Sequence, residues 1–512
     1  MSFEKRYRQF YDNIYGFVKL CREEYDEILH DPYFLRLHNI KQMGLCHYVF
    51  PDALHTRYSH SLGVYSIMQK IIAAQEENYL DLFKLADDDK RSILLSALLH
   101  DVGHLPLSHT IEVALERFHE EDKEEEHSDP IEGIFENDQE IPIATKVEQK
   151  GSQFPNDNLR TEKVKLEDDT KLHEELGEYV ITCTALKSKV EAKLDLNVNK
   201  IASGFKGITS EVDKEEAKQN PALVFARNFL HSQLDADRID YLLRDASFSG
   251  VRSGAFDFDK LITEIRYDDE GNYGVNYSGI RAIEQFFMSR FAAYTQIVFN
   301  KKVHGLDYMA GDFYYRLLKL RQKGDLPSDI VIYSFKDIKA MLEKKPDDFL
   351  RFTDDYFHSL VQKVDDSNID DYTIKQYVML LKNRTPLKSV AYEEFFATDA
   401  EFKRRDSFIS YLKNPENKEK LAHSAGVQYD DIIIPQKPLK VTIFDRSVDP
   451  ISIFNGEKVN KNILDCEETL LNLIIDKKLY LQRIFTFDED KQEKIKKAMT
   501  EMSRAFNKKG NF

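Results

Sequence analysis

The sequence LLHDVGHLPLSHTIE spans Leu98–Glu112 and joins an apolar run to a group of histidines. Residues 91–99 are apolar on nearly every side of a helix, which predicts a helix buried in the middle of a bundle and ended by Gly103. The adjacent pair His100 and Asp101 then enters the interior, where an unpaired imidazole and carboxylate are costly to bury. A divalent cation bound by both side chains removes that cost, so the pair predicts a metal site.

Two residues cannot fill a coordination sphere, and further donors are expected at polar breaks in apolar helices. His60 in RYSHSLGV precedes an amphipathic helical pattern, and Asp237 lies in LDADRIDYLLRD. Two histidines and two carboxylates, completed by water, suit Mn, Mg, Fe, Ni or Zn. For Asp235 and Asp240 of the same segment, helix capping and surface salt bridges explain the carboxylates as well as a functional role does.

The composition limits the class of protein. The 512 residues carry 72 Lys and Arg against 89 Asp and Glu, a net charge of -17, and 42% of them are hydrophobic. The length allows about three domains or one large decorated domain. The negative charge disfavours a protein that coats nucleic acid, because phosphates demand a basic surface, yet it leaves room for a local basic pocket.

The cysteines and the N-terminus indicate a reducing compartment. The four cysteines are scattered and form no CxxC pair, which disfavours a disulfide framework or a zinc ribbon. MSFEKRYRQF contains no apolar signal core, and no stretch of about 18 apolar residues is present. We therefore expect a cytoplasmic protein that neither enters a membrane nor takes nucleic acid as its partner.

Patterns along the chain predict four regions. A helical core covers 1–118 and 221–325, and the polar, acidic stretch 119–220 is interpreted as an insertion with short helices. Residues 326–429 continue in helical patterns, and 430–512 form a small α+β unit that ends in a Lys-rich helix. That helix is predicted as a solvated surface, with an oligomer contact or an allosteric nucleotide site as the alternative. The expected fold class is mainly α with a small α+β C-terminal extension.

Three ordered segments carry a resemblance to a known family. IKQMGLCHYVFPDALHTRYSHSLGV (Ile40–Val64), LLHDVGHLPLSHTIE and LDADRIDYLLRD (Leu234–Asp245) resemble the HD-domain superfamily of phosphohydrolases. More narrowly, they resemble the dNTP triphosphohydrolases, a group that holds bacterial dGTPases and the vertebrate SAM- and HD-domain dNTPase. The resemblance covers residues 30–320 and implies an HD-domain helical bundle.

The resemblance implies a catalytic centre, position by position. The four protein ligands of one catalytic metal ion would be His60, His100, Asp101 and Asp237. The histidines beside the α-phosphate, and the carboxylate–histidine pair that orients water or protonates the leaving group, would be His104, His109, Glu112 and His127.

The resemblance also implies a substrate site. Its residues would be Gln42, Met43, Arg57, Arg238, Tyr241, Asp245, Arg290 and Phe299. The arginines would hold phosphates, Met43 would lie under the sugar or base, and Gln42 and Asp245 would meet the 3′-OH. Tyr241 and Asp245 share one helical face with Arg238, at i, i+3 and i+7. Phe299 would pack its ring against C2′ of the sugar. The sequence after Arg290, Val298-Phe299-Asn300-Lys301, departs from the family's Tyr-Gln-His-Lys. The base preference and the deoxy or ribo choice therefore stay open.

The function implied is metal-dependent hydrolysis of dNTPs to a deoxynucleoside and inorganic triphosphate. Related enzymes assemble as homo-oligomers (dimers, tetramers or hexamers), often under control of a nucleotide activator, and serve dNTP pool control or defence against viruses and phages. Two alternatives stay open. One is an HD phosphohydrolase acting on ribonucleotides, alarmones or monophosphates. The other is a nucleotide-responsive regulatory or assembly protein, which the complete H…HD…D set disfavours.

Overall fold

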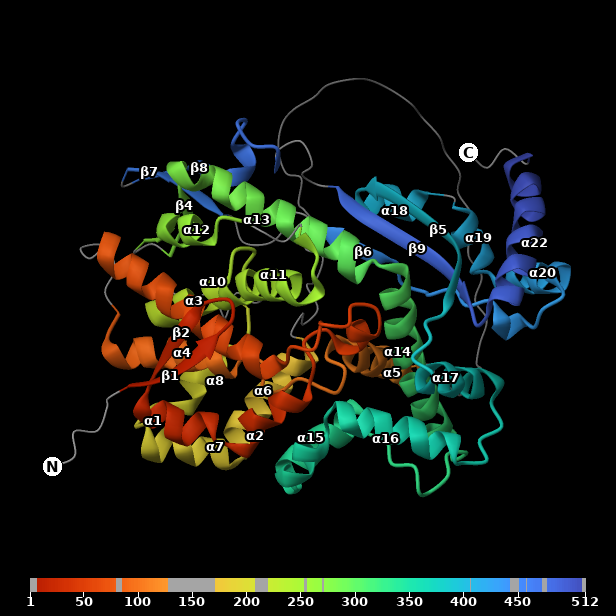
Figure 1. Cartoon of the computed structure of the whole chain (residues 1–512), viewed down its shortest axis with the longest axis horizontal. Coiled ribbons are helices and arrows are strands. Elements are labelled where there is room, and N and C mark those ends of the chain that lie inside the picture. Colours follow the sequence, from red (N-terminus) through yellow and green to blue (C-terminus); the bar gives the residue numbers. More distant parts are fainter. Residues whose placement is uncertain are drawn as a thin grey trace, which may run out of the picture.

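The computed structural model describes residues 7–79, 85–127, 171–207, 220–252, 256–268, 271–405, 407–442, 451–456, 458–471 and 477–508. Helices form most of the body, and three small sheets lie at its edges (Figure 1). The expected fold class, mainly α with a small α+β extension, is confirmed. In the described part of the chain, no helix combines the length and the apolar character needed to cross a membrane.

One hydrophobic core lies among helices from the N-terminal half and the middle of the chain. These are α3 (Arg57–Asn78), α4 (Asp87–Leu99), α10 (Pro221–His231), α11 (Ala236–Ser249), α12 (Phe258–Glu264) and α13 (Ile280–Ala293). As expected, α4 is buried along most of its length after the charged first turn. The carboxylate of Asp235 accepts the backbone N–H of Arg238 and caps α11, while Gly250 ends that helix with a positive φ of 74°.

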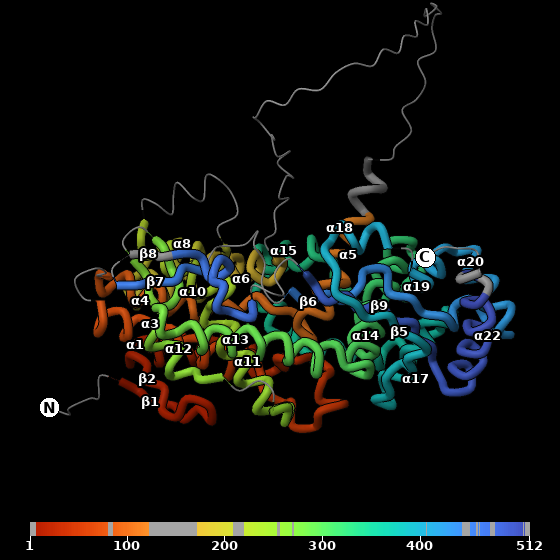
Figure 2. Tube along the Cα trace, turned by 90° about the horizontal axis from the view of Figure 1, so that it is seen from above, coloured from red at the N-terminus to blue at the C-terminus, as the bar shows by residue number. Residues whose placement is uncertain are grey.

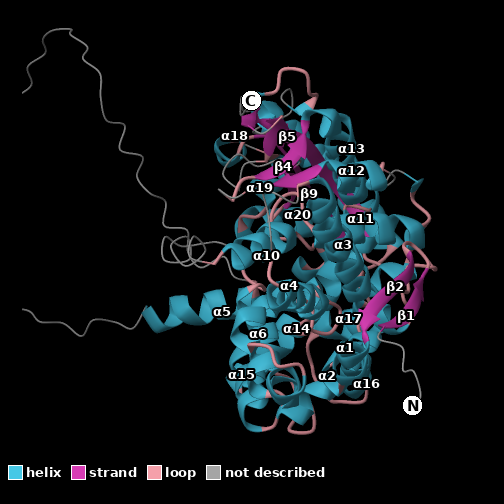
Figure 3. Ribbon diagram, turned by 90° about the vertical axis from the view of Figure 1, so that its left-hand side faces the viewer, coloured by secondary structure: helices cyan, strands magenta, loops and turns pink. Residues whose placement is uncertain are grey.

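A second core lies beside the first and gathers more distant segments. It shares α3 and α4 with the first core, and the short helix α1 (Arg22–Glu24) precedes it in the chain. Its other helices are α2 (Pro32–Leu35), α5 (His109–His127), α6 (Leu172–Cys183), α7 (Ala185–Ser188), α8 (Val198–Ser203), α14 (Lys301–Lys323), α15 (Phe335–Lys344), α16 (Asp354–Asp365) and α17 (Tyr372–Lys382). The helices α6 to α8 come from the predicted acidic insertion, yet they contribute buried residues to this core. Figure 3 shows α5 extending away from the body at its far end.

The sheets connect segments that are far apart in the sequence. β1 (Tyr7–Asp12) and β2 (Gly16–Cys21) form a hairpin. The second sheet has the order β3 (Ile265–Tyr267), β4 (Tyr273–Asn276), β7 (Ser452–Asn455) and β8 (Lys458–Asn462). Its β4 and β7 run parallel, so C-terminal residues complete a sheet that the middle of the chain begins.

The third sheet and its helices form the far end of the molecule. The sheet has the order β5 (Lys388–Ala397), β9 (Lys478–Thr486) and β6 (Leu439–Thr442). The surrounding helices are α18 (Asp399–Arg404), α19 (Phe408–Leu412), α20 (Pro415–Ala425) and α22 (Glu489–Lys508). Seen from above, the hairpin β1–β2 and α22 lie at opposite ends of the body (Figure 2).

The structure contains strands in each of the segments expected to be helical. The strands β1 and β2 lie inside 1–118, and β3 and β4 lie inside 221–325. The strand β5 lies inside 326–429, where helical patterns were expected. It forms because β9, about 90 residues further on, supplies its hydrogen-bonding partner, and a local pattern does not reveal such a pairing. Residues 128–170 of the acidic stretch lie outside the described residues. The domain boundaries stay a prediction.

Candidate metal centre and adjoining cavity

Three helices bring the four predicted metal ligands together. His60 lies in the first turn of α3, His100 and Asp101 directly follow α4, and Asp237 lies in the first turn of α11. His60 Nε2 is 3.0 Å from Asp237 Oδ1 and 3.6 Å from Asp101 Oδ2. His100 Nε2 is 3.3 Å from Asp101 Oδ1 and 4.0 Å from Asp237 Oδ1. Because α3 packs against both α4 and α11, the helices fix this arrangement.

The donor atoms fit one divalent metal ion. The Nε2 atoms of His60 and His100 are buried, and no hydrogen-bond partner of suitable geometry lies among the residues that the structure describes. Together with a carboxylate oxygen of Asp237, they lie within 4.8 Å of one another. Buried nitrogens without a partner, facing two carboxylates, are costly in the absence of a cation and well suited to its presence. This mixed donor set is compatible with several metals.

Backbone and side-chain groups orient the two histidine ligands. Nδ1 of His60 is hydrogen-bonded to Asp240 Oδ2 at 2.7 Å, and Nδ1 of His100 to the carbonyl oxygen of Ala97 at 2.9 Å. Both imidazoles therefore keep the proton on Nδ1 and point Nε2 toward the centre. Asp240 is fully buried and is held in turn by Arg244 through bonds of 2.8 and 3.0 Å.

These contacts distinguish the roles of Asp235 and Asp240, which the sequence alone did not decide. Asp235 is the helix cap that was expected, although it is buried and also pairs with the Arg238 side chain. Asp240 is neither a cap nor part of a surface salt bridge, because its carboxylate is buried between Arg244 and His60, a predicted metal ligand. Its position three residues after Asp237, one turn along the same face of α11, is the signal that could have revealed it.

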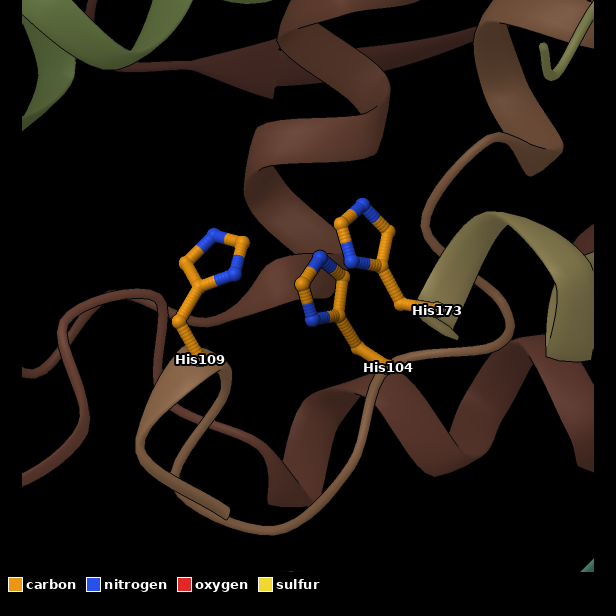
Figure 4. Close-up of side chains that lie close together, drawn as sticks. All are labelled: His104, His109 and His173. Carbon is orange, nitrogen blue, oxygen red and sulfur yellow. The ribbon is translucent and has the colours of Figure 1, made fainter. Parts of the chain in front are cut away.

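His104, His109 and His173 form a second group of histidines (Figure 4), and Nε2 of His104 is 3.1 Å from Asp101 Oδ1 of the metal centre. Glu112 accepts hydrogen bonds from Nδ1 of His109 and Nδ1 of His173, each at 2.8 Å, and from the backbone N–H of His173 at 3.0 Å. Burial alone would raise the pKa of Glu112, but the two histidines hold it well below its usual range. The rings of His104 and His173 stack with centroids 4.0 Å apart. His104 is 1% exposed, and among the described residues its Nδ1 has no hydrogen-bond partner.

Among the described residues, the histidine that joins His109 beside Glu112 is His173. His127 was expected, but its side chain, at the end of α5, lies outside the described residues. His173, in the first turn of α6, takes the place beside Glu112. The two residues are 61 positions apart, with a long acidic stretch between them, so spacing along the sequence could not find the pair. Its only signal is the dipeptide His173-Glu174, which repeats a histidine beside a carboxylate.

A cavity of about 310 Å³ opens beside the metal centre. Of the residues predicted to bind substrate, those that line it are Gln42, Met43, Arg57, Arg238, Tyr241 and Asp245. Arg57 connects the cavity to the metal centre, since its Nη1 donates to Asp101 Oδ2 at 2.9 Å. Asp245 is held by His55, whose Nε2 donates to Asp245 Oδ1 at 2.8 Å.

Two predicted substrate residues do not line this cavity. Phe299 is packed in a hydrophobic cluster with Val441 and Leu479 of the C-terminal sheet. The reason is a wide turn before it, closed by a hydrogen bond from Phe299 N–H to the carbonyl of Tyr294 at 2.7 Å, which spans five residues and shifts the register. Tyr294 lines the cavity in place of Arg290. The Arg290 guanidinium lies 6.0 Å from the centre of the Tyr294 ring.

Comparisons with known proteins agree with this geometry. The sequence model of the HD domain matches residues 57–155. The chain is 27% identical over 340 residues to the uncharacterized protein YwfO of Bacillus subtilis, covering 65% of this chain and 62% of that protein. It is 25% identical over 264 residues to the deoxynucleoside triphosphate triphosphohydrolase SAMHD1 of Xenopus laevis, covering 51% of this chain and 37% of that enzyme. The chain thus spans about three fifths or less of the length of these relatives.

Solved structures show the same fold. A phosphohydrolase from Bacteroides thetaiotaomicron superposes with a TM-score of 0.63 at 20% identity, over 94% of this chain and 100% of that one. A hypothetical protein from Aquifex aeolicus gives 0.62 at 23% identity, over 96% and 100%. The HD-domain match covers the segment that holds His60, His100 and Asp101, and proteins named as deoxynucleoside triphosphate triphosphohydrolases are among the distant relatives of this chain.

Proposed function

We propose that this protein hydrolyses deoxynucleoside triphosphates to a deoxynucleoside and inorganic triphosphate, with a divalent metal ion held by His60, His100, Asp101 and Asp237. The observation that carries the proposal is the joining of two features in one cavity. Its wall combines the metal donors His100, Asp101 and Asp237 with the arginines Arg57 and Arg238. The distant relatives named as dNTP triphosphohydrolases support the same substrate class.

The metal-side residues suit attack of water on the α-phosphorus. When bound, the cation polarises a phosphate oxygen and lowers the pKa of a coordinated water. Arg57 donates to Asp101 through Nη1 and to the Ser108 hydroxyl oxygen through Nε, so its guanidinium is fixed beside this position. A fixed guanidinium stabilises the negative charge that develops on the phosphate in the transition state.

The histidines around Glu112 suit the proton transfers. Because Glu112 binds Nδ1–H of His109 and of His173, the Nε2 atoms of both rings are left to exchange protons with a ligand. We assign His109, which lines the cavity, to the 5′ oxygen of the leaving deoxynucleoside. Water forms the new bond to the α-phosphorus and releases a proton to solvent, while the bond to the 5′ oxygen breaks. That oxygen takes a proton from Nε2 of His109 in its imidazolium form, and solvent then protonates the ring again.

The sugar would lie against α11. Asp245 Oδ1 is occupied by His55, which leaves its second oxygen to accept the 3′-OH. Tyr241, one turn earlier, lines the same side of the cavity. Control by a nucleotide activator, assembly into a homo-oligomer and a role in dNTP pool control or defence belong to the same proposal.

Product analysis tests the proposal. Purified protein is incubated with each dNTP and NTP, singly and mixed, with Mn²⁺ or Mg²⁺, and the products are separated by chromatography. The expected products are deoxynucleoside and triphosphate, absent in Asp237→Ala and retained in the exposed control Asp355→Ala. Monophosphate and pyrophosphate would assign a different reaction to the same centre, and no turnover in any mixture would contradict the proposal.

A further inference from the structure

The cavity wall has a second part whose chemistry differs from the metal side. Cys46, Ile297 and Val303 line it, and the three side chains belong to one hydrophobic cluster against which Met43 packs. These residues present apolar surface without a charge to hold a phosphate. A wall of this kind fits the faces of a flat aromatic ring better than it fits a triphosphate or a sugar.

One carboxyl group, that of Asp307, interrupts this apolar wall. Asp307 lies one helical turn after Val303 on α14, so both side chains lie on the same face of the helix. Its recorded partner is the hydroxyl of Thr110, which donates to Oδ1 over a long distance of 3.4 Å. In the part of the chain that the structure describes, no Lys, Arg or His nitrogen forms an ion pair with it.

The carboxyl group is therefore poorly satisfied by the protein itself. Burial raises the pKa of Asp307 to about 7, and only the hydrogen bond from Thr110 opposes that shift. Asp307 is half-buried, and a carboxylate that the cavity wall partly shields from water and that accepts one long hydrogen bond keeps acceptor capacity for a donor supplied by a ligand. Neither the metal centre nor the proton transfers proposed above use this group.

The ligand part that suits this position is the edge of a nucleobase. A carboxylate repels the triphosphate, and the sugar is accounted for by Tyr241 and Asp245. Among the four bases, guanine offers two adjacent donors, N1–H and N2–H, spaced for the two oxygens of one carboxylate. Thymine flanks its one N–H with carbonyl oxygens, and adenine and cytosine place a ring nitrogen acceptor beside their amino group.

We infer that Asp307 reads the base of the substrate and selects guanine. The inference rests on the proposed function, because it names the substrate that the same cavity takes. The apolar side chains of Met43, Cys46 and Ile297 would cover the purine faces, and the Asp307 carboxylate would accept N1–H and N2–H.

The test compares base selectivity in the wild type and Asp307→Asn, which keeps the size of the side chain but replaces one acceptor oxygen by a donor. kcat/KM is measured for dGTP, dATP, dCTP and dTTP at saturating metal. The wild type is expected to prefer dGTP. The variant is expected to lose roughly 10- to 100-fold in kcat/KM for dGTP, chiefly through KM, and much less for the others. Asp325→Asn, exposed just after α14, is the control and should leave selectivity unchanged.

The outcomes separate this inference from the proposed function. If the wild type hydrolyses dNTPs but prefers another base, or if Asp307→Asn keeps the same selectivity, the inference is overturned and the proposed function stands. If the wild type hydrolyses no dNTP, the proposed function fails, and calorimetric binding of dGTP and dTTP then tests Asp307 directly. In that binding experiment, tighter binding of dGTP than of dTTP by the wild type, lost in Asp307→Asn, supports the inference. The same ratio of dGTP to dTTP affinity in both proteins overturns it.

Discussion

Single buried side chains hold the metal ligands in place. Asp240 is the clearest case, since it binds Nδ1 of His60 and is itself fixed by Arg244. A carboxylate behind a ligating histidine sets its tautomer and increases its basicity. The metal centre therefore depends on a residue that would never touch the metal.

Replacing Asp240 by Asn should weaken metal binding without unfolding the protein. The amide keeps an oxygen for Arg244 but loses the negative charge behind His60, so metal affinity should fall by about 10- to 100-fold. Equilibrium dialysis with Mn²⁺ measures the affinity, and activity should return at saturating metal. A variant that loses stability in the metal-free form but binds Mn²⁺ as tightly as the wild type would show that Asp240 is merely structural.

The titration of Asp307 should make stability depend on pH. Its pKa is raised to about 7 in the fold, against roughly 3.9 in an unfolded chain. The unfolded state releases this proton first, so the contribution of Asp307 to stability falls as pH rises from about 4 to about 7. As the pH rises over that interval, the melting temperature of the wild type should therefore fall relative to that of Asp307→Asn. A difference that is constant from pH 4 to pH 8 would contradict the burial of this carboxyl.

At the scale of elements, close approaches join parts of the chain that are distant in sequence. Gly274 of β4 lies against Ser452 of the parallel strand β7. A Cβ atom at Gly274 would lie 1.9 Å from the backbone oxygen of Ser452, so only glycine allows the two strands to pair. The sheet beside the first helical core thus depends on this one position.

Gly274→Ala should separate β7 from β4 and lower the free energy of unfolding by about 1–3 kcal/mol or more. Urea denaturation measures the change. Gly207→Ala is the matched control, because a Cβ there would meet only the Cβ of His231 at an ordinary 3.6 Å. Equal stabilities of the two variants would contradict the pairing of β4 with β7.

The predicted residues that the structure brings together share a local signal. The four metal ligands come from short motifs, and Arg238, Tyr241 and Asp245 follow from the period of one helix. His173 was missed because it pairs with Glu112 across 61 residues. Phe299 was misplaced because a wide helical turn shifts the register by one residue, and β5 was missed because its partner strand lies far along the chain. The local sequence pattern predicts which face of a helix a residue occupies. Contacts between distant segments and irregular helical turns leave no such pattern, so they require the three-dimensional structure.

At the scale of the whole molecule, the centre lies where the two helical cores adjoin. The first core supplies α3 and α11 with His60 and Asp237, while α5, α6 and α14 of the second supply His109, His173 and Asp307. Because α3 and α4 contribute buried residues to both cores, the proposed metal ligands and the histidines around Glu112 lie where the cores meet, and the cavity takes part of its wall from each. The packing of the two cores against each other therefore determines the positions of the cavity residues.

The most direct test of this account is hydrolysis of dNTPs in H₂¹⁸O with the metal-loaded full chain, followed by mass spectrometry of the products. The account predicts an unlabelled deoxynucleoside and a triphosphate that carries one ¹⁸O atom, because water attacks the α-phosphorus and the bond to the 5′ oxygen breaks. Label in the 5′-OH of the deoxynucleoside, or release of monophosphate and pyrophosphate, would contradict it.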